Sequence, residues 1–116
     1  MAENSFEYLF ANFQWLHYID KNLLSATTLT SYCYSHMFDS SGIFEVPNLS
    51  ATTLATYCYQ QIFYQCMNLT KIPNNLLPAT SLKGYCYSGM FYGCQNLRSL
   101  PNNLLSATTL ATYCYY

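Results

Sequence analysis

The sequence predicts an α/β solenoid, a right-handed coil with short parallel strands on one face and helices on the other. Three observations lead to this prediction. A motif returns every 25 to 28 residues, apolar residues within each copy follow the spacing of a helix face, and an apolar segment that ends in proline comes after each helix pattern. Periods of this length are typical of repeat proteins in which each copy packs only on its neighbours.

The repeat is defined by the string Ala-Thr-Thr-Leu, which begins at residues 26, 51 and 107, with Ala-Thr-Ser-Leu at residue 79. Each string leads to Tyr-Cys-Tyr, centred on Cys33, Cys58, Cys86 and Cys114. We therefore expect one repeat domain over residues 1–116. Its parts are a degenerate partial repeat at 5–22, repeats at 23–47, 48–75 and 76–103, and a truncated repeat at 104–116.

The first half of each copy has the spacing of a helix. Leu54, Cys58 and Ile62 follow one another at steps of four, as do the corresponding residues of the other copies, which places them on one helix face. The helix is expected to end near Gly93 and its equivalents. The segments 43–47, 69–73 and 97–101 then read as short strands, because the closing proline favours extended backbone before it.

The composition excludes several classes of protein. Only 8% of the residues are charged and the net charge is -1, with four basic residues in all, so the clustered Lys and Arg of a nucleic-acid binder are missing. No apolar run reaches the eighteen or so residues of a membrane span. The N-terminal residues also lack the basic and apolar regions of a signal peptide.

The motifs resemble those of a known family. Leu77–Leu82, Tyr85–Cys94 and Leu97–Pro101 are similar to BspA-type leucine-rich repeats, which are known from bacterial surface proteins. The resemblance implies a leucine-rich-repeat coil that acts in adhesion without catalysis. It also implies a location at the cell surface or outside the cell, as part of a longer chain. The sequence departs from the family pattern in that the secretion signal, surface anchor and capping segments are missing.

Two columns of the aligned copies vary freely while the Leu, Cys, Tyr and Phe columns stay nearly constant. Strand side chains that point away from a solenoid core line its concave binding surface, so we expect partner contacts at these positions; the alternative is that they are ordinary exposed residues. The eight candidate binding residues are His17, Phe44, Thr70 and Arg98 in one column and Tyr18, Glu45, Lys71 and Ser99 in the next.

The six cysteines lack a C-x-x-C spacing, so a zinc site is not expected. Unpaired, buried thiols are favoured over disulfides because stacked helices would hold the Cα atoms too far apart for bridges. Most of the thirteen tyrosines belong to the repeated Tyr-Cys-Tyr, which favours core packing over a role in carbohydrate or protein contact.

No catalytic motif is present, and no cofactor or metal is expected. His17 and His36 stand in different columns without an evident partner, and the acidic residues form no recurring pair of the kind that acid–base catalysis needs. The leading interpretation is a non-enzymatic binding module that contacts a protein or glycan on a host or neighbouring cell. The alternative is a structural spacer or self-assembling segment whose uncapped repeats associate end to end.

Overall fold

Continuous turns replace the predicted helices. The computed structural model describes residues 3–102, 104 and 107–114, and within these residues the chain forms no helix and no sheet. Strand pairing there is confined to the isolated parallel bridges Thr28–Thr53 and Ser81–Thr109. The prediction of an α/β solenoid with leucine-rich-repeat strands and helices is therefore wrong. The chain is a compact, turn-rich body of 35 × 32 × 23 Å; the expected truncation point at Tyr116 lies outside the described residues.

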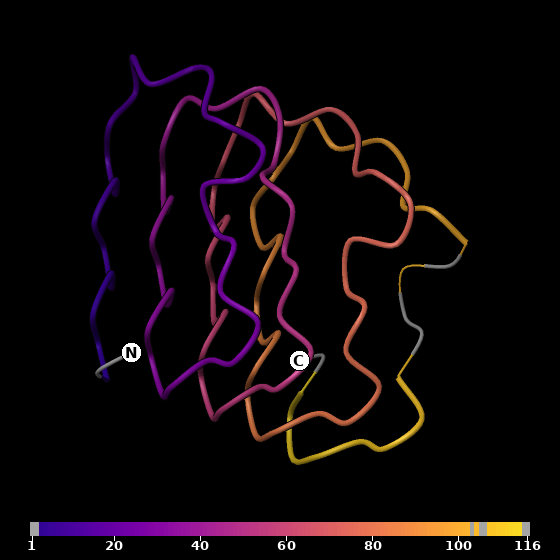
Figure 1. Ribbon diagram of the computed structural model, residues 1–116. Helices are drawn as coiled ribbons and strands as arrows, with labels where there is room; N and C mark the ends of the chain where they lie inside the picture. Colours follow the sequence, from indigo (N-terminus) through magenta and orange to yellow (C-terminus); the bar gives the residue numbers. More distant parts are fainter. Residues whose placement is uncertain (1–2, 103, 105–106, 115–116) are drawn as a thin grey trace.

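Successive copies of the motif lie side by side, as Figure 1 shows. We call the segments 3–12, 31–40, 56–65, 84–93 and 112–114 the turn segments. Within them the backbone N–H groups alternate between two kinds of partner. The Ser35 N–H donates to the Tyr32 carbonyl three residues back, at 3.1 Å, whereas the Tyr34 N–H donates to the Cys58 carbonyl of the next segment, at 3.0 Å. Half of the donors thus join neighbouring segments, a use that a helix excludes because it satisfies its donors internally.

The backbone of the turn segments explains why the helix prediction failed. In the segment 31–40, the residues with positive φ are Tyr32, His36 and Ser40, so one left-handed residue recurs every fourth position. A turn pattern with a period of four places Leu29, Cys33 and Met37 on the same side, much as a helix of period 3.6 would. Each left-handed non-glycine residue costs about 1–2 kcal/mol, which the hydrogen bonds between segments help to offset.

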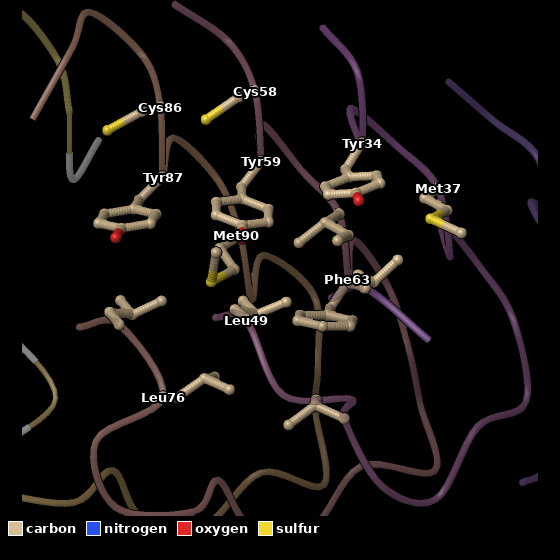
Figure 2. Close-up of a cluster of buried hydrophobic side chains, with 14 of the residues drawn as sticks. Tyr34, Met37, Leu49, Cys58, Tyr59, Phe63, Leu76, Cys86, Tyr87 and Met90 are labelled. Atoms are coloured by element: carbon tan, nitrogen blue, oxygen red, sulfur yellow. The ribbon is translucent and has the colours of Figure 1, made fainter. Parts of the chain in front are cut away.

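Two columns of stacked aromatic rings fill the core between the turn segments. Tyr34, Tyr59 and Tyr87 stack with ring centroids 5.8 and 6.0 Å apart, and Figure 2 shows these three rings in one row. A parallel column contains Phe38 and Phe63, whose centroids are 6.0 Å apart. All five rings are buried. The prediction that tyrosines of the motif pack in the core is confirmed for this column.

The other tyrosine of each motif forms a third column nearer to solvent. Tyr32, Tyr57 and Tyr85 stack at 4.6 and 4.7 Å between centroids, and each ring is half-buried. Both tyrosines of a motif therefore contact their equivalents in the neighbouring copies. Stacked pairs of this kind stabilise a fold by about 0.5–1.5 kcal/mol beyond the area they bury.

All six cysteines are buried and unpaired, as the interpretation of these residues as small apolar core residues predicted. The Cys66 thiol donates to the Phe38 carbonyl and the Cys94 thiol to the Phe63 carbonyl, each at 3.1 Å. Burial raises the pKa of Cys58 to about 12 and that of Cys66 to about 12, because an apolar environment disfavours the thiolate. These thiols are therefore core groups that also tie one copy to the next.

The second half of each copy is irregular. We call the segments 15–24, 42–50, 67–78 and 95–102 the variable side. The predicted strands at 43–47, 69–73 and 97–101 do not pair into a sheet. Backbone contact between the first two copies consists of single hydrogen bonds, such as the Phe44 N–H to the His17 carbonyl at 2.9 Å. Gly42 marks the start of this region, where a Cβ atom would lie 1.9 Å from the Gln14 carbonyl oxygen.

Candidate binding site

All eight candidate binding residues are exposed on the variable side. The structure brings three of them into one aromatic cluster. The Phe44 ring lies 4.9 Å from the His17 ring and 5.6 Å from the Tyr18 ring, measured between centroids. Phe44 is 40% exposed and Tyr18 is 74% exposed, so both side chains are partly open to solvent. The local cause is the hydrogen bond from the Phe44 N–H to the His17 carbonyl, which holds the two copies in register.

A surface pocket of about 420 Å³ adjoins this cluster, and we call it the Phe44 pocket. Three of the eight candidate residues line it, namely Phe44, Glu45 and Lys71. The remaining lining residues are Lys21, Val46, Asn48, Ile72, Pro73 and Asn74. A smaller cavity of about 270 Å³ is lined by some of the same residues, including Asn48 and Asn74, so the two form one hollowed region of the variable side.

Sequence reasoning missed Lys21, Asn48 and Asn74 because it considered only two columns. A signal for Lys21 was nevertheless present, since it stands four residues after His17 just as Asn48 stands four residues after Phe44. The Asn48 N–H donates to the Lys21 carbonyl at 2.9 Å, which confirms that these two positions are neighbours. A third column, with lysine in the first copy and asparagine in the others, therefore contributes Lys21, Asn48 and Asn74 to the site.

The charges of the pocket are not neutralised by neighbours. Among the described residues, an ion pair forms between His36 and Asp39, with Nδ1 and Oδ2 2.9 Å apart. Lys21, Lys71 and Glu45 take no part in it. Two of the four basic residues of the sequence thus line one pocket beside a single acid, a formal sum of +1. Both ammonium groups are open to a ligand.

The other candidate residues do not join this pocket. Thr70, Arg98 and Ser99 are exposed but do not line it. The variable columns therefore divide into a cluster around Phe44 and separate exposed positions further along the chain.

His36 has a partner that the sequence analysis did not find. Its Nδ1 atom lies 2.9 Å from Oδ2 of Asp39, and the Tyr8 ring stacks on the imidazole at 4.5 Å between centroids. The spacing of three residues between His36 and Asp39 was the available signal. Ser40 donates its hydroxyl to Oδ1 of Asp39 at 2.7 Å, so the hydroxyl is directed to the carboxylate. The group lies in the turn segments and ties residues 36–40 together.

In the searched part of the chain, no group of three or more His, Cys, Asp or Glu side chains is placed to hold a metal ion. The described residues also contain no helical segment with the length and hydropathy needed to cross a membrane. In comparisons with protein-family models, curated proteins and solved structures, none matches this chain. The resemblance to BspA-type repeats stays a prediction.

Proposed function

We propose that this chain is a non-enzymatic binding module of a surface or secreted protein, and that it recognises a protein or glycan on a host or neighbouring cell. The observation that carries the proposal is the contrast between a repeated, buried frame and a cluster of variable, exposed side chains around one pocket. Exposed aromatic rings beside unpaired charges are typical of binding surfaces.

Binding without catalysis fits the geometry of the polar groups. The histidine–carboxylate pair of His36 and Asp39 directs no nucleophile, since the adjacent Ser40 hydroxyl donates to the carboxylate and not to the imidazole. Nucleophilic catalysis instead requires the nucleophile within hydrogen-bond reach of its base. At the Phe44 pocket, the charged groups are spread around an opening with exposed rings, which suits contact with a ligand surface.

The test is a screen against arrays of extracellular proteins and cell-surface glycans. We expect the double variant Phe44→Ala, Lys71→Ala to lose at least about tenfold in affinity for the ligand found, because hot-spot residues contribute about 2 kcal/mol or more. The matched control is Tyr92→Ala, Lys83→Ala, which removes an exposed ring and an exposed lysine outside the pocket. Equal binding by both variants would show that the Phe44 pocket is not the recognition site.

Self-association is the alternative function, and exposed apolar residues in the first two dozen residues favour it. Tyr8 is 52% exposed, Leu9 is 48% exposed and Trp15 is 75% exposed. Such residues lower the cost of joining a second copy. Sedimentation of the unaltered chain and of Trp15→Ala separates the two functions, since an assembling segment would show concentration-dependent mass that the variant reduces. A binding module would sediment equally in both forms.

A further inference from the structure

We propose that the Phe44 pocket binds a saccharide that carries a carboxylate, such as a uronic or sialic acid unit. This inference rests on the proposed function and names its ligand class. Three sets of groups around the pocket carry it: exposed rings, two lysines without ion-pair partners, and side-chain amides.

The rings supply the surface that a sugar ring packs against. The half-exposed Phe44 ring lines the pocket, and the exposed Tyr18 ring lies beside it, outside the lining, with the two centroids 5.6 Å apart. Val46 and Ile72 line the pocket nearby and are buried, with 6% and 7% exposure, so they give it an apolar base. The C–H faces of a pyranose are apolar, and aromatic rings are the side chains that present a large, rigid surface to such a face.

The lysines favour an anionic ligand. Lys21 and Lys71 come from different copies of the repeat and line the same pocket, and neither forms an ion pair with a described residue. An ammonium group is a compact charge that pairs with a carboxylate or phosphate oxygen and forms strong, charge-assisted hydrogen bonds. The pocket thus carries two groups able to bind an anion, one from each of two different copies.

The amides favour a hydroxyl-rich ligand over a simple anion. Asn48 and Asn74 line both the Phe44 pocket and the smaller cavity beside it. Asn48 Nδ2 donates one hydrogen bond to Oδ1 of Asn22 at 3.4 Å. A side-chain amide has a second N–H and a carbonyl oxygen besides, which matches a sugar hydroxyl that both donates and accepts. The volume of about 420 Å³ lies in the range of about 300–1,000 Å³ that small-molecule sites occupy. Rings, amides and lysines together fit an acidic sugar better than they fit an inorganic anion.

Glu45 allows a test of whether the bound ligand carries a negative charge. Its carboxylate lines the same pocket and repels an anionic ligand. Replacing it by glutamine should therefore tighten binding of an acidic saccharide by about two- to fivefold, since exposed charges interact weakly through water. A ligand that placed an amine beside Glu45 would bind less tightly to the same variant.

The experiment is calorimetric titration of the chain with tetragalacturonate and sialyllactose, each compared with its neutral counterpart, the tetragalacturonate methyl ester and lactose. We expect at least one acid form to bind at least about tenfold more tightly than its neutral counterpart, because the charged hydrogen bond is lost in the latter. Lys21→Gln and Lys71→Gln should each weaken binding by about tenfold. Lys83→Gln is the control, since Lys83 is exposed but does not line the pocket.

Oligoglutamate of matched charge and inorganic phosphate serve as further probes. Binding of either one as tightly as the acidic saccharide would overturn the inference, and so would neutral and acidic saccharides that bind equally or not at all. A failure of this inference can be told apart from a failure of the proposed function. In that case the Phe44→Ala, Lys71→Ala variant would also keep its full affinity for whatever ligand the arrays identify.

Discussion

The turn segments and the variable side are two halves of the same repeat that are held together in different ways. Between the turn segments 31–40 and 56–65, alternate N–H groups from Tyr32 to Ser40 each donate to a carbonyl of the next copy, at 2.7 to 3.3 Å. On the variable side, contact between copies includes single bonds such as that from Asn68 Nδ2 to the Gly42 carbonyl, at 2.9 Å. Hydrogen bonds between copies therefore occur at every second residue of the turn segments but only at isolated positions on the variable side.

This difference explains which residues repeat and which vary. A residue in a stacked column must match its equivalents above and below, so Tyr59 and Phe63 have little freedom to change. A residue such as Phe44 or Lys71 has an exposed side chain in a region with few backbone constraints, and substitution there costs little stability. The fold therefore separates a rigid frame from the positions where a ligand site can be altered.

The largest effect should come from a ring of the frame. Phe63 is fully buried and stacks on Phe38 and Phe91 at 6.0 and 5.8 Å. Phe63→Ala should lower the free energy of unfolding by about 3–5 kcal/mol, as buried aromatic truncations do. The matched variant Phe44→Ala removes an exposed ring of the variable side and should cost less than about 1 kcal/mol. Urea unfolding followed by near-UV circular dichroism of the tyrosines measures both.

The comparison fails if the two phenylalanine variants lose similar stability. A loss of several kcal/mol for Phe44→Ala would mean that the aromatic cluster at the pocket belongs to the core. A small loss for Phe63→Ala would mean that the stacked columns are not what holds the frame together.

An intermediate effect is expected at the junction of the two halves. Gly42 lies so close to Gln14 that a Cβ atom would come within 1.9 Å of the backbone carbonyl oxygen. Backbone cannot swing aside as a side-chain tip does, so Gly42→Ala should cost about 1–3 kcal/mol through forced displacement. Gly84→Ala is the control, since its nearest contact would be an ordinary 3.6 Å to the Thr112 carbonyl oxygen. Thermal unfolding of the two variants should differ accordingly.

Equal stability of Gly42→Ala and Gly84→Ala would show that residues 13–14 can move away from residue 42. The variable side would then be loosely attached to the frame from its first residue.

The sequence predicted which residues face inward but not the backbone that carries them. Leu29, Cys33 and Met37 are buried, as the stripe required, because burial follows hydrophobicity in either a helix or a ladder of turns. The two backbones differ in period by less than half a residue over each turn, so a stripe of three residues cannot distinguish them. The abundance of the weak helix formers Thr, Tyr and Cys was the sign that the backbone would adopt another conformation.

Only part of the candidate site was predicted, because the comparison of the copies covered only two of its columns. Comparison of the copies located Phe44, Glu45 and Lys71, whose columns vary, and the structure shows that these three line one pocket. Lys21 was missed because it lies outside the two variable columns, four residues after His17. Hydrogen bonds between copies, such as that from Asn48 to Lys21, fix the alignment there, and they are not visible in the order of residues.

The smallest effect concerns pH and again separates the two halves, since Cys58 is buried in the frame. Burial raises the pKa of this thiol to about 12 in the folded chain from an ordinary value near 9. The neutral thiol is favoured in the fold, so its contribution to stability is complete below pH 9 and is lost as the pH rises from 9 towards 12. Between pH 9 and pH 10 this one group should lower the free energy of unfolding by about 1 kcal/mol. Cys58→Ala removes that contribution and leaves every other titratable group in place. Urea unfolding at the two pH values should therefore show a fall in the free energy of unfolding that is about 1 kcal/mol smaller in the variant than in the unaltered chain.

Identical falls in the two proteins would mean that the Cys58 thiol reaches solvent in the folded state and that the frame is open at its centre.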